Sequence, residues 1–132
     1  MLSATLSGCL GGPDDTSEWL EYLGHEVTRL DIDEFELSVT VENIAEEEIE
    51  AVGIFIDVYE DDTRLGEFRT RMLDLPAGIR ETASTKVFGF EAEDVTHYTI
   101  EIGASVPGGT TEPIEFAYDG DAFRERVHAE RG

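Results

Sequence analysis

Several residue types are scarce in this chain of 132 residues, which has one cysteine, one lysine, one asparagine and no glutamine. One cysteine cannot close an intrachain disulfide or supply the several Cys and His ligands of a structural zinc site. No stretch approaches the ~20 apolar residues of a membrane-spanning helix. Nine basic residues stand against 31 acidic ones, so the chain has no basic stripe for phosphate and would repel nucleic acid and anionic lipid headgroups.

Acidic residues are correspondingly abundant. The net charge is −22, and the carboxylates are spread along the whole chain rather than gathered in a tail. This composition resembles that of proteins from extreme halophiles, because at about 1 M salt the Debye length is about 3 Å and self-repulsion is screened. An ordinary acidic mesophilic protein is the alternative. The hydrophobic content of 40% predicts that the domain folds despite its charge.

The stretch from residue 35 to residue 65 organises the predicted fold. Apolar residues alternate with polar ones at Phe35, Leu37, Val39 and Val41. A second segment places Val52, Ile54, Ile56 and Val58 on one face, with Gly53, Phe55, Asp57 and Tyr59 on the other. A period of two is that of half-buried strands. We predict two neighbouring strands of one antiparallel sheet.

Further strands are predicted on both sides of this pair, at intervals of about 10–15 residues and separated by Gly, Pro or acidic turns. The first covers residues 18–30 with a bulge near Gly24, and a later one covers residues 81–90 with a bulge at Gly89. About seven strands predict an all-β fold, an immunoglobulin-like Greek-key β-sandwich, as a single domain over residues 18–132. Tyr98, four residues after Asp94, is either a tyrosine corner bonded to nearby backbone or a core tyrosine.

The end of the chain departs from the strand pattern. We predict a short C-terminal helix from about residue 121, capped by Asp121, with Phe123 and Val127 on one side. A single short helix is not stable alone in water, so it should dock on the domain. The predicted docking surface is the exposed aromatic pair Phe55 and Tyr59.

Residues 1–17 form a separate predicted segment, a signal-peptide remnant with a lipobox and a tether. Leu6, Ser7, Gly8 and Cys9 resemble a lipobox, the signal at which a lipoprotein precursor is cleaved and its Cys acylated. Only eight residues precede Cys9 and none is basic, whereas a secretory signal has a cationic start and an apolar stretch of about 7–15 residues. We therefore expect a start codon upstream of Met1, or a fragment. The alternative is a cytoplasmic protein in which Cys9 is an ordinary thiol.

A family resemblance rests on short hydrophobic and turn motifs between residues 18 and 105. The positions that carry it are Ile56, Val58, Tyr59 and Glu60, with Val41, Asn43, Leu65, Gly66, Leu75, Pro76 and Gly78 around them. They resemble FxLYD-type domains, with Ile56 in place of the family's Phe and Glu60 in place of its Asp. The resemblance implies an immunoglobulin-like sandwich of the kind found in lipoproteins of halophilic archaea and of bacteria, mostly without assigned activity.

The sequence shows no catalytic constellation. His25, His97 and His128 stand apart from any nucleophile pattern, and we expect all three at the surface. The acidic runs at residues 31–34 and 60–62 contain ligands suited to calcium but lack the order of an EF-hand, so we interpret them as solvated faces. We expect a non-enzymatic protein with no metal and no cofactor.

These features predict a membrane-anchored extracellular lipoprotein, held at the outer face of the cell membrane through lipid on Cys9 alone. It would serve as a surface binding or scaffolding module for an unknown protein or surface ligand. Loops at the ends of sandwiches often carry recognition, so the candidate binding residues are Val106, Gly108, Gly109, Thr110 and Thr111. Two alternatives are an accessory subunit or small-ligand carrier of an exported transport or redox system, and a cytoplasmic acidic interaction domain.

Overall fold

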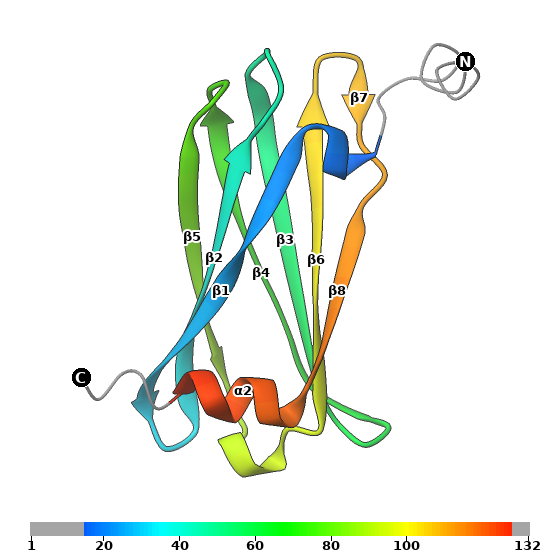
Figure 1. Cartoon of the computed structure of the whole chain (residues 1–132). Helices are drawn as coiled ribbons and strands as arrows, with labels where there is room; N and C mark the ends of the chain where they lie inside the picture. Colours follow the sequence, from blue (N-terminus) through cyan, green and yellow to red (C-terminus); the bar gives the residue numbers. More distant parts are fainter. Residues whose placement is uncertain (1–14, 128–132) are drawn as a thin grey trace.

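The computed structural model describes residues 15–127, which form two antiparallel sheets packed face to face (Figure 1). The first sheet has the order β1-β2-β5 and contains β1 (Leu20–Asp31), β2 (Glu34–Asn43) and β5 (Arg80–Phe88). The second has the order β4-β3-β6 and contains β4 (Thr63–Leu75), β3 (Ile49–Glu60) and β6 (His97–Val106), with β7 (Gly109–Thr110) and β8 (Ile114–Asp119) both paired to β6. Two 3-10 turns, η1 (Thr16–Glu18) and η2 (Ala92–Asp94), and helix α2 (Gly120–Val127) complete the described part. The predicted all-β sandwich is confirmed.

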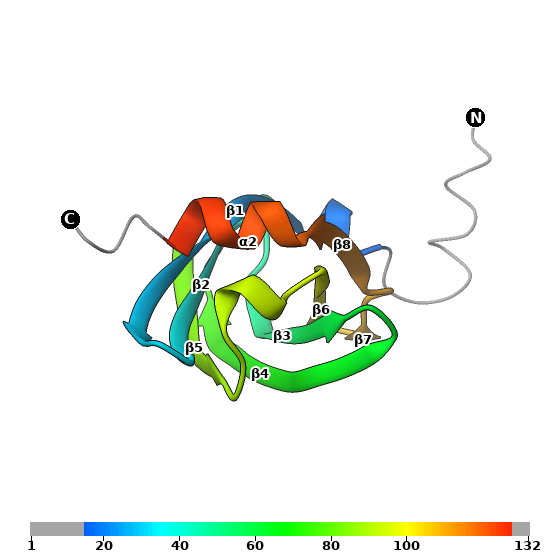
Figure 2. The same cartoon turned by 90° about the horizontal axis from the view of Figure 1, so that it is seen from below.

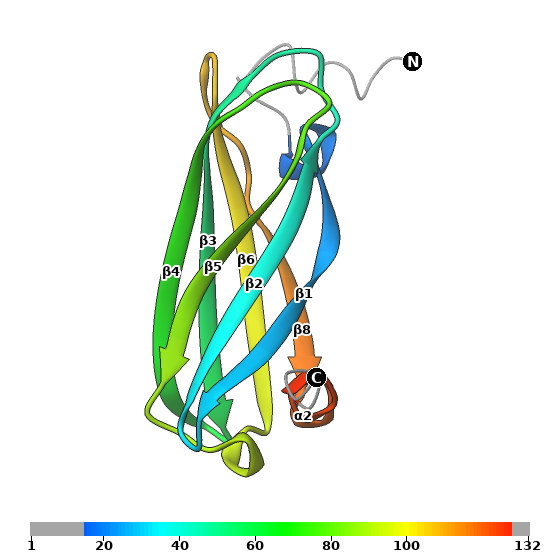
Figure 3. The same cartoon turned by 90° about the vertical axis from the view of Figure 1, so that its left-hand side faces the viewer.

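The prediction that the two central strands are neighbours in one sheet is wrong. β2 pairs with β1 and β5, whereas β3 pairs with β4 and β6, so the two strands belong to different sheets (Figure 3). Residues 44–48 carry the chain from one sheet to the other. A strand with one buried face has the same alternation whether its successor lies beside it or opposite it, and the pattern alone therefore cannot tell these cases apart.

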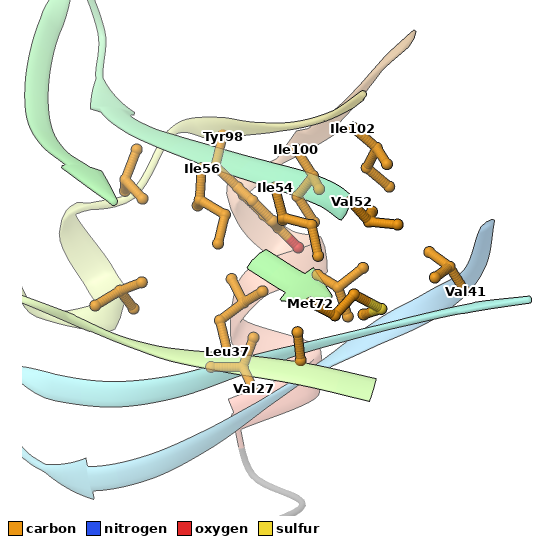
Figure 4. Close-up of a cluster of buried hydrophobic side chains, with 14 of the residues drawn as sticks. Val27, Leu37, Val41, Val52, Ile54, Ile56, Met72, Tyr98, Ile100 and Ile102 are labelled. Atoms are coloured by element: carbon orange, nitrogen blue, oxygen red, sulfur yellow. The ribbon is translucent and has the colours of Figure 1, made fainter. Parts of the chain in front are cut away.

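The core lies between the two sheets, where side chains from both inner faces meet (Figure 4). The predicted inward residues of both central strands are all 0% exposed: Phe35, Leu37, Val39, Val41, Val52, Ile54, Ile56 and Val58. Tyr98, Ile100 and Ile102 of β6 complete the same layer. Tyr98 is thus a core tyrosine, and its hydroxyl lies 2.7 Å from His25 Nε2 rather than on nearby backbone, so it is not a tyrosine corner.

A bulge at Gly24 changes which residues of β1 face the core. The pairing with β2 shifts register between Tyr22 and Gly24, and Gly24 has a φ of 128°, which favours glycine. Leu20 and Tyr22 point inward before the bulge, and His25 and Val27 do so after it. The predicted bulge near Gly24 is confirmed. Gly89, in contrast, follows the end of β5 and is not a bulge within it.

Helix α2 does not dock on Phe55 and Tyr59, so that prediction is wrong. The helix contacts β1, β8 and η2, and it closes one end of the sandwich at the edge where β1 and β8 approach (Figure 2). Phe123 is 0% exposed and packs with ring-centroid distances of 5.2–5.8 Å against Phe35, Phe90 and Tyr98. An open end of a sandwich exposes core rings, and covering them stabilises the helix more than an outer face would.

The cap of α2 also differs from the prediction. Asp119 Oδ1 accepts a hydrogen bond from Ala122 N at 2.9 Å, so Asp119 caps the helix, whereas Asp121 pairs with Arg124 at 3.0 Å. Arg124 also donates from Nη1 to the carbonyls of Ala92 and Val95, both at 3.0 Å. These bonds tie α2 to η2 and to the start of β6.

Candidate functional site

The described chain begins at one end of the sandwich, beside the hairpin that follows β6 (Figure 1). Asp15 forms a parallel bridge with Glu112, and Thr16 N donates to Glu112 O at 3.1 Å. The hydroxyls of Thr16 and Thr111 lie 2.6 Å apart, and Thr111 Oγ1 also accepts a hydrogen bond from Ala104 N at 3.0 Å. The N-terminal segment is therefore fixed to the β6–β8 connection. We call this the tether end of the domain. Cys9 lies outside the described residues.

The predicted recognition loop is a short hairpin at the tether end. β7 pairs back on β6 through Ser105 with Thr110 and Val106 with Gly109, so residues 107 and 108 alone form the turn. Gly108, Gly109 and Thr110 are exposed, whereas Val106 and Thr111 are 2% and 5% exposed. Two of the five predicted residues therefore belong to the packed base of the hairpin, and three are accessible to a partner.

A polar aromatic cluster fills the edge between the two sheets where β1 faces β8. We call it the aromatic seam, and its members are Tyr22, His25, Tyr98, Phe116 and Tyr118. The Tyr22 hydroxyl lies 2.7 Å from His25 Nδ1 and 2.7 Å from the Tyr118 hydroxyl. His25 is 6% exposed, so the prediction of a surface position for it is wrong. The bulge at Gly24 turned it inward; His97 is exposed as predicted, and His128 lies outside the described residues.

The seam is held together by neutral groups. Burial, followed by the charge of Arg126, lowers the pKa of His25 from 6.5 to about 4. Burial raises the pKa of the Tyr98 and Tyr22 hydroxyls. Arg126 caps the seam from α2: its guanidinium lies 5.4 Å from the centre of the Tyr118 ring, and its Nε donates to His25 O at 3.2 Å. A neutral imidazole bonded to phenols on both nitrogens closes the edge of the sandwich without burying a charge.

The outer face of the first sheet is a row of paired hydroxyls with ion pairs at both ends. Ser38 lies 2.8 Å from Ser84, and Thr40 lies 2.7 Å from Thr82, oxygen to oxygen. Glu42 pairs with Arg80 at 3.2 Å at one end, and Glu34 pairs with Lys86 at 3.0 Å at the other. A shallow hollow of about 580 Å³ lies over part of this row, next to Gly24. The hydroxyls of the row are paired with one another.

The outer face of the second sheet contains a hollow of about 600 Å³ that we call the Gly53 groove. Its lining is Ala51, Gly53, Phe55, Arg69, Thr70, Arg71 and Ser105. Gly53 pairs directly with Gly103, and Pro113 packs against Gly103. The Phe55 ring leans over Gly53, and Phe55 is 39% exposed. Arg71 stands opposite Gly53 and Arg69 opposite Phe55 along the groove.

The basic side chains fall into two groups. Most of those that the structure describes have a partner: Arg64, Arg80, Lys86 and Arg124 in ion pairs and Arg29 and Arg126 over aromatic rings. Arg69 and Arg71 have no ion pair, hydrogen bond or ring contact with any residue from 15 to 127. Two free guanidinium groups thus stand side by side on one groove of an acidic protein.

No three or more His, Cys, Asp or Glu side chains in residues 15–127 are grouped so that they could hold a metal ion. In the same part of the chain, no helix is long and apolar enough to cross a bilayer.

No family model and no curated protein matches the sequence. The similarities found are to solved structures. The structure of wild-type OgpA from Akkermansia muciniphila is 16% identical, with a TM-score of 0.45 over 79% of this chain and 28% of OgpA. The solution structure of AT1g01470 from Arabidopsis thaliana is 14% identical, with a TM-score of 0.49 over 76% of this chain and 79% of that one. β-Glucosidase 3B from Thermotoga neapolitana is 14% identical, with a TM-score of 0.42 over 76% of this chain and 16% of the enzyme.

The chain therefore spans less than a third of the length of OgpA and less than a fifth of the glucosidase. At such identities and TM-scores the likeness gives no activity to this chain.

Proposed function

We infer that the chain is the folded domain of a lipid-anchored lipoprotein at the outer face of the cell membrane, and that it acts there as a non-enzymatic binding or scaffolding module. The observation that carries this proposal is the Leu6, Ser7, Gly8, Cys9 motif with the only cysteine of the chain at its end. A lone thiol near the start of the chain has no disulfide partner within it, whereas acylation gives it a role.

The position of the tether end adds an orientation to this proposal. Asp15 is bridged to Glu112, and five residues separate it from Cys9, so the two positions can lie at most about 20 Å apart. With lipid on Cys9, the hairpin at residues 106–111 would stand close to the membrane, and α2 and the β3–β4 turn would stand at the far end. The outer faces of both sheets would then be accessible from the side.

The FxLYD-type resemblance and the acidic composition support a lipoprotein of a halophilic organism. Ile56 and Val58 of the motif are buried at the end of β3. Tyr59 stacks on His97 with ring centroids 4.7 Å apart, and its carbonyl accepts a hydrogen bond from Thr96 N at 2.9 Å. In this proposal the motif joins β3 to β6 and has a structural role, while binding belongs to the outer surfaces.

The competing proposal of a small-ligand carrier needs an apolar pocket between the sheets. Large side chains that are 0% exposed occupy that space, among them Phe35, Ile54 and Ile100, and both the Gly53 groove and the hollow over the hydroxyl row lie on outer faces. We therefore favour recognition on the outside of the sandwich.

Membrane fractionation tests the proposal. The full reading frame, with any upstream codons restored, is expressed in a halophilic host as wild type and as Cys9→Ser, and intact cells are treated with protease. We expect wild type in the membrane fraction, where protease digests it on intact cells. We expect Cys9→Ser to be released from the membrane. Both forms in the soluble cell interior would overturn the proposal and support a cytoplasmic interaction domain.

A further inference from the structure

The Gly53 groove lies at the centre of a sheet face, with the Phe55 ring over Gly53 and Pro113 against Gly103. Gly53 and Gly103 are cross-strand partners, and a glycine inside a strand marks a place of close approach, which here is made by Phe55 and Pro113 of the chain itself. The groove is bounded on one side by the Phe55 ring and on the other by Arg69 and Arg71 of β4, the edge strand of its sheet. Its walls therefore offer one apolar contact and two cations.

The two arginines are free in a chain where cations are scarce. Against the 31 acidic residues of the chain stand nine basic ones, and every other described Arg or Lys has a partner. Glu67, the nearest acid along β4, is bonded to Arg64 at 3.0 Å and so is occupied elsewhere. A planar guanidinium with five donors matches a carboxylate in bidentate geometry, and this chemistry indicates an anionic ligand.

The spacing of the arginines indicates the form of that ligand. Arg69 and Arg71 are two residues apart on one face of a strand, so their Cα atoms are separated by about 6.6 Å. Carboxylates at alternate residues of an extended polypeptide have the same separation. We propose that the Gly53 groove binds an extended segment of a partner protein with acidic side chains at alternate positions, which lies along β4 with its carboxylates on Arg69 and Arg71.

The charges on the rest of the face fix the side on which the segment lies. Glu101 stands on β6 opposite Phe55, and Glu115 stands beside it on β8. These carboxylates repel an acidic ligand, whereas β4 attracts it. The segment therefore runs along β4, on the β4 side of Phe55.

This inference deepens the proposed function, because it names the surface and the chemistry of the partner. It is tested in solution on the full chain without its lipid, so a negative result leaves the fractionation experiment on Cys9 unaffected.

The experiment measures binding of a fluorescent peptide by polarisation at about 1 M salt, where the Debye length of about 3 Å leaves only contact interactions. The probe is an extended peptide with Glu at every second position, and its control has Gln at those positions. The double variant Arg69→Gln/Arg71→Gln should bind the Glu peptide about tenfold more weakly or worse, because two charge-assisted contacts are lost. The double variant Arg80→Gln/Lys86→Gln removes the same charge from the other sheet and should bind like wild type. Glu101→Gln should bind more tightly.

Other outcomes overturn the proposal. No binding of the Glu peptide by wild type, equal binding of the Gln peptide, or equal weakening in both double variants would refute a specific site. The chain itself has acids at Glu46, Glu48 and Glu50. Light scattering that shows a dimer dissociated by the Arg69 and Arg71 changes would make a second copy the occupant. If the Arg69→Gln/Arg71→Gln variant lost binding to a polyuronate oligosaccharide but bound the Glu peptide like wild type, the occupant would be a carbohydrate.

Discussion

Asn43, the only asparagine of the chain, should be a strong determinant of stability because its side chain holds the crossover between the two sheets. It is 0% exposed. Its Nδ2 donates to Glu47 O at 2.9 Å and to Leu75 O at 3.0 Å, and its Oδ1 accepts from Ala45 N at 2.9 Å. The three bonds connect the end of β2, the bend at residues 44–48 and the end of β4.

The magnitude follows from these three bonds. At a net contribution of about 1 kcal/mol each, Asn43→Ala should lower the free energy of unfolding by about 3 kcal/mol. For a domain of this size that corresponds to a fall in Tm of roughly 12 °C. The assay is urea unfolding at fixed salt, followed by the fluorescence of Trp19, whose carbonyl accepts a hydrogen bond from Ile44 N at 2.9 Å.

Two further variants make this test specific. Asn43→Asp keeps the acceptor but loses both donors and places a carboxylate against two carbonyl oxygens, so it should destabilise at least as much as Asn43→Ala. Ser84→Ala removes an exposed hydroxyl from the hydroxyl row and should change stability by less than about 0.5 kcal/mol. A loss below about 0.5 kcal/mol for Asn43→Ala would refute the claim that its amide anchors the crossover.

Three other changes test other parts of the fold. Phe123→Ala, at a residue 0% exposed among three rings, should cost about 3–5 kcal/mol, whereas Phe88→Ala, at a residue 54% exposed, should cost far less; urea unfolding of both variants checks this. The pKa of His25 is lowered to about 4 in the folded state, so folding favours the neutral imidazole. The free energy of unfolding should therefore be highest above pH 6.5 and fall by about 3 kcal/mol at most as the pH drops from 6.5 to 4. Unfolding of His25→Gln across that range should lack this component, and an identical pH dependence in both proteins would contradict it. Gly24→Ala, at a φ of 128°, should cost about 1–3 kcal/mol in the same assay, and no loss would contradict the need for glycine there.

The strands and their inward faces were predictable because a strand that buries one face places apolar residues at every second position. Residues such as Leu37 and Val39 alternate with polar neighbours, and the structure buries them fully. Sheet membership was not predictable by the same rule, because alternation describes one face of a strand and not its partner. The site of α2 was missed for a related reason: the apolar side of Phe123 and Val127 predicts docking, while the open end that it covers exists only once both sheets are assembled.

The candidate site was harder to predict than the fold. The buried position of His25 depends on a one-residue bulge at Gly24 that reverses the alternation of β1. Arg69 and Arg71 occupy ordinary outward positions, and their significance appears only after the partners of the other basic residues are known. One signal was present in the sequence: Gly53 interrupts an otherwise bulky strand, which marks a place of close approach.

The most direct test of the account is the intact mass of the mature protein, expressed in a halophilic host from the full reading frame, with any upstream codons restored. The account predicts a chain that begins at Cys9 and has added lipid mass. An unmodified chain that retains Met1 would contradict it, and the folded domain at residues 15–127 would then have to act without a membrane anchor on Cys9.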